Sequence, residues 1–273
     1  QIAALVLLAA CVLLFRQRAG NVLLHGGVAL MMFGEFFVSY FAAEQQMTLA
    51  EGQAVSYTRD IRSVELAITT LSLADRDDVV AVPTETKGRI THFARGKTVD
   101  LDDLPFLVEV VRYYRNSKLE VATPQSSNPA TMGVGPRFIA EEAPPQSGVQ
   151  GGKVDLASAY VEVTDKKSGE SLGTYLLTQH FSSARRELNT VSAGGADYGL
   201  ALRFKRSYKP YRITLLDVRQ DDYVGTAMAR NYSSRVRLRD PSRNIDFETT
   251  IWRNNPLRYA GETFYQRGYN VDG

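Results

Sequence analysis

The sequence is poor in the residues on which most redox and metal sites depend. Among its 273 residues it has one cysteine, Cys11, three histidines and one tryptophan, Trp252. A single cysteine excludes an internal disulfide and any Cys-x-x-Cys motif, so the chain is neither a thiol oxidoreductase nor itself a c-type cytochrome. Because Cys11 lies inside an apolar run, it is interpreted as a small buried hydrophobic residue without a chemical role.

Catalytic signatures are missing as well. The sequence has no Gly-x-Ser-x-Gly elbow and no phosphate-binding glycine loop. His92 and His180 lie far apart in strand-like contexts, where an ordinary surface or hydrogen-bonded histidine is the more frequent interpretation. The acidic run Asp75–Asp78 lacks the ligand spacing of a calcium loop and is typical of a solvated turn. We therefore predict no catalytic residues.

Neither sign of charge is in excess. The chain has 32 Lys and Arg against 30 Asp and Glu, a formal net charge of +2. This balance produces no field that would attract nucleic acid, and no nucleic-acid-binding motif is present, so nucleic acid is excluded as a partner. With 44% hydrophobic residues, the chain has enough material for one large core or two small ones.

Long apolar runs dominate the N-terminal part. Residues 1–15 carry no charge, and between Ala19 and Ala43 only Glu35 is charged. The second run is about 37 Å long as a helix, more than the roughly 30 Å of a bilayer core. Since only Arg16-Gln17-Arg18 separates the runs, we predict a helical hairpin in the lipid bilayer rather than a cleavable leader, with transmembrane helices at 1–15 and 20–43.

The hairpin's two arginines predict its orientation. By the positive-inside rule, Arg16 and Arg18 stay in the cytoplasm, so the second helix runs outward. Residues 1–43 are thus expected to anchor the chain in the bacterial inner membrane, and residues 44–273 to form a large domain on the periplasmic side. The chain begins with Gln1 inside an apolar run, and we expect it to be a piece of a longer protein.

From Thr48 onward, short alternating segments favour β-structure. Apolar and polar residues alternate in four runs that predict strands, and a turn at 165–170 predicts a hairpin between the first two. The predicted strands are 159–164, 173–178, 212–217 and 235–239.

Other segments of this part predict a helix and loops. One short helix is predicted at Leu104–Arg115, because Leu104, Leu107, Val108 and Val111 would share a face. Segments 124–136 and 143–153 are rich in loop-forming residues, and the second is a candidate boundary between two β lobes. The predicted fold is mainly β and membrane-anchored, with a β-sandwich-like extracytoplasmic domain that contains a short helix.

Two polar residues of the second apolar run are candidates for function. His25 and Glu35 are separated by about 15 Å of helical rise and about 1000° of rotation, so they cannot form a direct proton relay. His25 precedes Gly26-Gly27, which leaves space for another helix or a flat ligand. Two interpretations of His25 stay open, an interfacial histidine bonded to headgroups and a ligand within the helix bundle. Glu35 is expected to face a partner helix or a neutralising group.

Basic side chains cluster in two places in the β-rich part. The first is the basic and aromatic stretch Arg203–Tyr211, and the second is the row Arg235, Arg237 and Arg239. In a strand these three arginines share one face, while Val236 and Leu238 point into the core. Arginine suits carboxylates and phosphates, but a solvated strand face is the default interpretation.

Three stretches resemble the ResB family, also called CcsB, of the System II machinery that assembles c-type cytochromes. The first runs from His25-Gly-Gly to the turn Thr48-Leu-Ala-Glu-Gly52. The second comprises Tyr208–Asp217, Tyr223–Thr226 and Asn231–Val236. The third, Asn254–Gln266, is similar to the family signature NxPLxYxGxxFYQ and is the most specific. Together the three stretches extend over nearly the whole sequence.

The resemblance implies a subunit that pairs with a CcsA/ResC integral membrane protein to form a cytochrome c synthetase, a haem lyase complex. That complex exports haem and joins it to the Cys-x-x-Cys-His of apocytochrome c. The resemblance places His25 at the family's transmembrane haem ligand, and haem as a transient cofactor. It also implies a non-catalytic role for this chain, and further helices before Gln1 and after Gly273. The alternative is a structural or sensory membrane-anchored ectodomain that binds a partner protein without haem.

Overall fold

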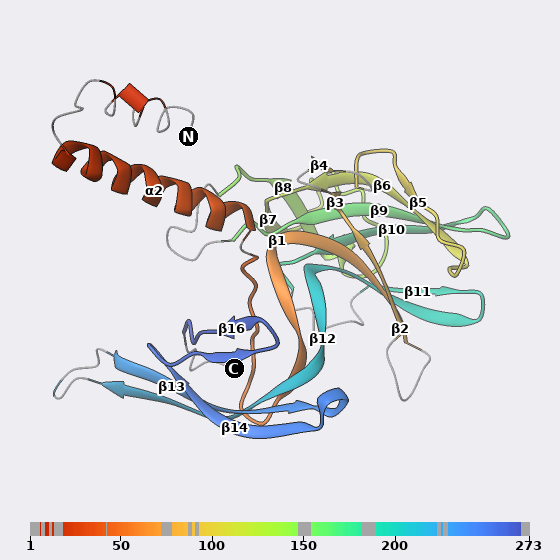
Figure 1. Ribbon diagram of the computed structural model, residues 1–273. Helices are drawn as coiled ribbons and strands as arrows, with labels where there is room; N and C mark the ends of the chain where they lie inside the picture. Colours follow the sequence, from red (N-terminus) through yellow and green to blue (C-terminus); the bar gives the residue numbers. More distant parts are fainter. Residues whose placement is uncertain are drawn as a thin grey trace. The chain divides into compact units, whose positions relative to one another are not determined.

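The computed structural model consists of two compact units, Gln1–Gln45 and Gln46–Gly273 (Figure 1). Each unit is considered by itself. The structure describes residues 6, 9, 10, 13, 19–41, 43–71, 78–86, 89–90, 93–146, 154–181, 189–222, 225 and 229–268.

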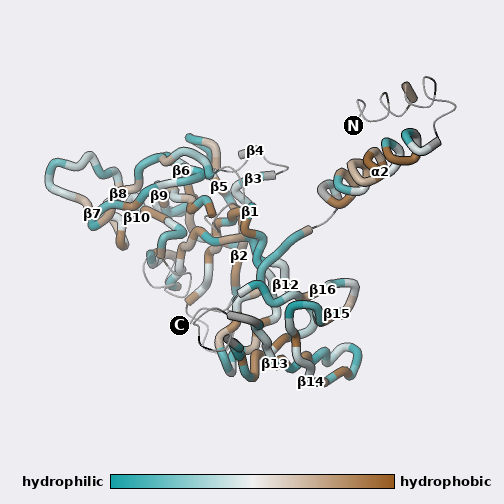
Figure 2. Tube along the Cα trace, turned by 90° about the vertical axis from the view of Figure 1, so that its left-hand side faces the viewer, coloured by the Kyte–Doolittle hydropathy of each residue, from teal (hydrophilic) through white to brown (hydrophobic). Residues whose placement is uncertain are grey.

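The first unit contains the helix α2, Ala19–Phe41. No proline interrupts it, and apolar residues give it the brown stretches seen in Figure 2. Many of its large apolar side chains are exposed. Aromatic rings four residues apart approach each other along it, with centroids 6.4 Å apart for Phe33 and Phe37 and 6.1 Å for Phe36 and Tyr40. In the part of the chain that the structure describes, no helix has both the length and the hydropathy of a membrane span.

The structure therefore does not show the two predicted transmembrane helices. The first, at 1–15, lies largely outside the described residues, and so do Arg16 and Arg18, on which the predicted orientation depends.

The second unit is built on a six-stranded antiparallel sheet. Its order is β14-β13-β12-β1-β2, and β11 also pairs with β12. The long strand β12 pairs with β1 over its first part and with β13 over its second, so β1 and β12 connect the two ends of the unit (Figure 1). The strands are β1 (Ala54–Thr70), β2 (Asp78–Pro83), β11 (Thr190–Ala193), β12 (Ala196–Asp222), β13 (Ala229–Asp240) and β14 (Ile245–Trp252).

A second antiparallel sheet has the order β10-β9-β6-β5. Three two-stranded ribbons, β3-β4, β7-β8 and β15-β16, complete the described strands. The bounds are β3 (Glu85–Thr86), β4 (Arg89–Ile90), β5 (Thr98–Val99), β6 (Phe106–Tyr114), β7 (Ser117–Val121), β8 (Phe138–Glu142), β9 (Ser158–Asp165), β10 (Ser171–Thr178), β15 (Leu257–Tyr259) and β16 (Glu262–Phe264), with 3-10 turns at Gly135–Arg137 and Pro241–Arg243.

The mainly β fold and all four predicted strands are confirmed. Asp165 caps the predicted β9–β10 hairpin turn, where its carboxylate accepts 2.8 Å hydrogen bonds from the backbone N–H groups of Lys167 and Ser168. Gly169 supplies the left-handed residue of the turn at φ +72°. Strands from both sides of segment 143–153, β6 and β9, pair in one sheet; residues 147–153 lie outside the described part.

The helix predicted at Leu104–Arg115 is wrong, because most of this segment forms strand β6. Phe106, Val108 and Val110 point into the main core and are fully buried. Val111 packs on the other side, against a separate cluster, after a register shift between Val110 and Arg112. Because both faces of β6 bury apolar side chains, its pattern lacks strict alternation and matches a helical face equally well.

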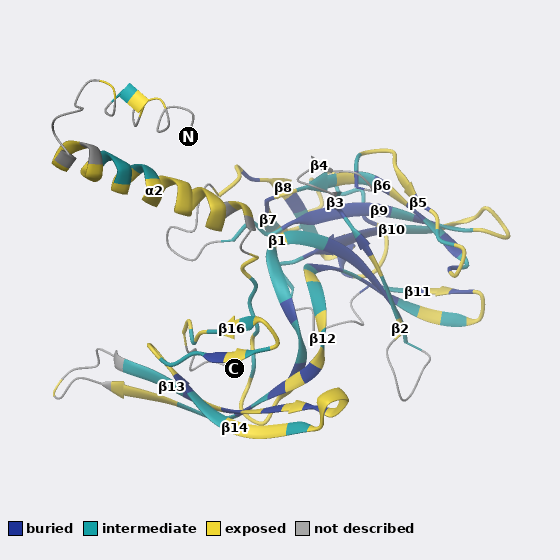
Figure 3. Ribbon diagram, viewed as in Figure 1, coloured by how far each residue is buried: buried dark blue, intermediate teal, exposed yellow. Residues whose placement is uncertain are grey.

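Three hydrophobic clusters hold the second unit together (Figure 3). The largest joins side chains of both sheets, including Leu66 and Ile68 of β1 and Val161 of β9. A second lies at the β13–β14 end of the six-stranded sheet, where Leu238 is fully buried. The third packs β7–β8 against the outer face of the smaller sheet, around Tyr160.

Candidate functional site

The predicted ligand His25 lies in the first half of α2 and is half-buried. Its Nδ1 atom is 2.8 Å from the backbone carbonyl oxygen of Asn21, one turn earlier. Since a carbonyl only accepts hydrogen bonds, this contact assigns the ring proton to Nδ1 and leaves the lone pair on Nε2. A Cβ added at Gly27 would meet nothing within 4 Å, so the helix surface at Gly27 is open.

His180 behaves differently from His25. His180 follows β10 in a turn, and its Nε2 atom lies 3.0 Å from the carbonyl oxygen of Ser117 and 3.3 Å from the Ser117 hydroxyl. It is the hydrogen-bonded histidine predicted from the sequence. His92 and Asp75–Asp77 lie outside the described residues. Among the residues that are described, no three His, Cys, Asp or Glu side chains gather as a metal site would require.

The arginine row of β13 has the predicted orientation, with Val236 and Leu238 buried and the arginines exposed. Arg237 donates two hydrogen bonds, of 2.6 and 2.7 Å, to the carboxylate of Asp246 on β14. These bonds hold the pKa of Asp246 below its usual value. Arg235 lies 3.7 Å from Glu248. The row is thus a solvated strand face on which Arg235 and Arg237 form ion pairs. This agrees with the default interpretation of the sequence.

The basic stretch Arg203–Tyr211 lies in β12 and is partly neutralised. Arg203 donates a 2.9 Å hydrogen bond to Glu65 on β1, and both side chains are more than nine-tenths buried. Lys209 bonds to Glu262, the first residue of β16. These acidic partners are distant in the sequence, so no local sequence pattern predicts either ion pair.

The C-terminal motif Asn254–Gln266 forms the β15–β16 hairpin. Ala260 and Gly261 both have positive φ, 50° and 81°, as a two-residue type I′ turn requires. The hairpin docks on β12 through Glu262, which accepts hydrogen bonds from Lys209 and from the hydroxyl of Tyr211. Burial and this carboxylate raise the pKa of Tyr211 well above its usual range.

A second contact fixes the same hairpin to β13. The hydroxyl of Tyr259 donates a 2.6 Å hydrogen bond to Asp240, the last residue of β13. Asp240 is fully buried and also accepts bonds from the N–H and hydroxyl of Ser242, at 3.0 and 2.6 Å. The rings of Tyr259 and Tyr211 meet edge to face at 5.0 Å. Tyr259 and Glu262 of the motif therefore serve to dock the hairpin on β12 and β13.

Asp240 makes the stability of this hairpin depend on pH. The hydrogen bonds from Ser242 and Tyr259 lower the pKa of Asp240, so its stabilisation is fully present above the unfolded-state pKa of about 3.9 and is lost as pH falls through the lower folded-state pKa. We expect the stability difference between wild type and Asp240→Asn to shrink between pH 5 and pH 2, measured as urea midpoints. Asp103→Asn, at an exposed site, is the control. A difference that does not change with pH would contradict this role.

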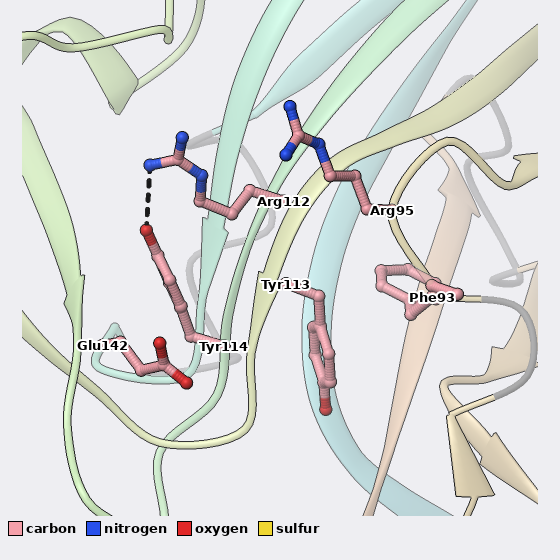
Figure 4. A pocket seen from close by; sticks show the side chains of 7 residues that line it. Phe93, Arg95, Arg112, Tyr113, Tyr114 and Glu142 are labelled. Carbon is pink, nitrogen blue, oxygen red and sulfur yellow. Dashed lines mark hydrogen bonds between the residues drawn. The ribbon is translucent and has the colours of Figure 1, made fainter.

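One open cavity of about 510 Å³ lies in the smaller-sheet end of the unit (Figure 4). Arg112 donates a 3.1 Å hydrogen bond to the hydroxyl of Tyr114, and the guanidinium groups of Arg95 and Arg112 lie on the same side of the cavity. These groups can donate to an anion, but the lining has no nucleophile beside a base. The cavity is lined by Phe93, Ala94, Arg95, Arg112, Tyr113, Tyr114 and Glu142.

Two similarities to known proteins bear on the function of this chain. Residues 176–273 match the model of the ResB-like family. This part of the chain is ResB-like. The predicted resemblance is confirmed for this part of the chain, and the match includes β13, β14 and the docked β15–β16 hairpin.

A related sequence is Protein NrfI of Wolinella succinogenes. The two sequences are 27% identical over 156 residues, which is 57% of this chain and 16% of NrfI. The chain thus spans about one sixth of the length of NrfI. His25 lies outside the family-matched residues 176–273, and its role stays a prediction.

Proposed function

We propose that this ResB-like chain is a non-catalytic subunit of a machinery that matures c-type cytochromes. The observation that carries the proposal is the family match over residues 176–273. In the proposal, unit Gln46–Gly273 is a binding platform that presents apocytochrome c, and a CcsA/ResC-type membrane protein is the partner. The platform role is supported by extensive strand surface and by a cavity with binding groups but no nucleophile–base pair in its lining.

The second element of the proposal is membrane anchoring through α2 and the apolar run at 1–15. Large apolar side chains of α2 are exposed, for example 81% of Leu23, 73% of Met31 and 74% of Tyr40. In water such exposure costs about 25 cal/mol for each Å² of apolar surface. We infer that lipid or a partner helix covers them in the bacterial inner membrane, with unit Gln46–Gly273 on the periplasmic side.

The third element is haem binding by His25. Its contact with Asn21 leaves Nε2 with a lone pair, which is the donor that haem iron accepts from histidine. The donor chemistry therefore fits. Haem would bring the vinyl groups that become attached to apocytochrome c. This chain would bind and orient the group through His25, and the partner would supply a second ligand.

Deletion of the gene that encodes this chain tests the proposed function. We expect haem-stained c-type cytochromes to disappear from membranes of the deletion strain and to return when the gene is restored. An immunoblot for the apocytochrome separates failed maturation from failed synthesis. Unchanged holocytochrome content in the deletion strain would contradict the proposal and favour a structural or sensory ectodomain.

A further inference from the structure

Two arginines and two tyrosines form a cluster in the middle of the β1–β12 pair. In the antiparallel register Tyr57 lies opposite Tyr208, and Arg59 lies opposite Arg206. Directly opposite residues point to the same face, and so do residues two apart in one strand. All four side chains therefore share one face of the sheet, and they are termed the Arg–Tyr cluster below.

Contacts within the Arg–Tyr cluster are close. The guanidinium carbon of Arg206 lies 4.2 Å from the centroid of the Tyr57 ring, a cation–π contact. The Tyr57 and Tyr208 rings have centroids 5.7 Å apart, and Tyr208 is 61% exposed. Arg59 donates a hydrogen bond to the hydroxyl of Thr48. The cluster thus combines positive charge with an exposed aromatic surface.

The charge of this cluster is not neutralised by a carboxylate. Neither Arg59 nor Arg206 takes part in an ion pair among the described residues, whereas Arg203 does, three positions away on β12. Asp60 lies on the opposite face and accepts bonds from the N–H of Arg62 at 2.9 Å and from the Ser63 hydroxyl at 2.7 Å. The Nε atom of Arg206 is buried and has no hydrogen-bond partner in the described part of the chain. A buried donor without a partner is costly.

Only a short segment of chain connects this cluster to the end of α2. The N–H and C=O groups of Gln46, the first residue of the second unit, form hydrogen bonds of 2.8 and 2.7 Å with the backbone of Arg59. Five peptide steps separate Gln46 from Phe41, the last residue of α2, and they span at most about 19 Å at 3.8 Å each. A bilayer that contained α2 would therefore hold the cluster near its surface.

We propose that the Arg–Tyr cluster binds the headgroup phosphate of an anionic phospholipid. The inference rests on the proposed anchoring of α2. Arginine binds phosphate through paired N–H donors, and tyrosine is favoured at the membrane interface because its ring is apolar and its hydroxyl is polar. The phosphate neutralises the charges of Arg59 and Arg206. The contact would orient the second unit on the membrane.

Fluorescence quenching in nanodiscs tests this inference with the full chain. A reporter chain carries Trp252→Phe and Tyr208→Trp, so that its one indole lies in the cluster. The discs contain phosphatidylcholine with a rising fraction of phosphatidylglycerol and a fixed fraction of headgroup-nitroxide lipid. We expect quenching to increase with the phosphatidylglycerol fraction. Arg206→Gln should raise the fraction for half-maximal quenching about fivefold, and Arg59→Gln/Arg206→Gln about 25-fold.

Matched variants separate binding from general charge effects. Arg235→Gln/Arg239→Gln removes the same charge from exposed positions of β13 and should leave the quenching curve unchanged. Arg59→Lys/Arg206→Lys keeps the charge and should recover part of the response, which also shows that the fold tolerates substitution there. The unmodified chain, whose one tryptophan is Trp252, should show no dependence on phosphatidylglycerol.

Three outcomes would overturn the inference. They are equal quenching in phosphatidylcholine discs with and without phosphatidylglycerol, loss of quenching on addition of inorganic phosphate at equal ionic strength, and a change of emission only when apocytochrome c is added. Comigration of the chain with the discs reports anchoring separately. A chain that does not comigrate contradicts the proposed anchoring, whereas a chain that comigrates without a lipid-dependent response contradicts only the Arg–Tyr inference.

Discussion

Replacing His25 by alanine is expected to lower the yield of holocytochrome c at least about tenfold, the loss seen when even a second-shell partner of a metal ligand is removed. The reason is that alanine has no nitrogen to replace Nε2, which the contact between Nδ1 and the Asn21 carbonyl leaves available. The yield is measured as covalently bound haem per apocytochrome in membranes of the complemented deletion strain.

Asn21→Ala is the matched control for this experiment. It changes a side chain on the same helix but keeps the backbone carbonyl that accepts the bond from His25, so we expect nearly wild-type yield. Immunoblots must show equal amounts of the two variants in the membrane. A wild-type yield from His25→Ala at equal protein level would remove His25 from the haem pathway and leave the family assignment intact.

Arg203→Met is expected to lower the free energy of unfolding by about 3–5 kcal/mol, because it leaves the carboxylate of Glu65 buried without its partner. The two groups are 2.9 Å apart, and their side chains are only 9% and 6% exposed. In the β1–β12 register this pair is next to the pair Leu66 and Leu202 of the main core. Because both charged side chains are buried, little water can reach the orphaned charge. Urea unfolding of the full chain measures the change.

Two further variants make this result specific to a buried ion pair. The double variant Glu65→Leu/Arg203→Met removes both charges and should recover most of the lost stability, since well-packed apolar residues often replace a buried pair without loss. Arg235→Met breaks the exposed 3.7 Å contact with Glu248 and should cost less than about 1 kcal/mol. A single Arg203→Met variant as stable as wild type would show that water or another group compensates Glu65.

The strands that could be predicted from the sequence are those with one buried and one solvated face. At 235–239, arginines alternate with Val236 and Leu238, and the structure buries only the apolar residues. Strand β6 was mistaken for a helix because apolar side chains are buried on both of its faces. Only 212–217 of the long strand β12 was predicted, since ion-paired Arg203 and Lys209 interrupt the alternation upstream.

The candidate site residues differ in the same way, because some depend on local sequence and others on long-range contacts. His25 could be singled out as a candidate because an imidazole is conspicuous in an apolar run and its hydrogen bond is local to one helical turn. Its role stays a prediction. The partners Glu65 and Glu262 could not be found, because they meet β12 from 138 and 53 residues away, through strand pairing and hairpin docking. The Arg–Tyr cluster depends on the register between β1 and β12, which no local pattern specifies.

The absorption spectrum of the detergent-purified complex with its CcsA/ResC-type partner tests the central claim most directly. If His25 binds haem, we expect a Soret band in the wild-type complex that is lost in the His25→Ala complex, with both subunits present in unchanged ratio. A wild-type complex without a Soret band, or a band of equal intensity in both complexes, would contradict haem binding by His25.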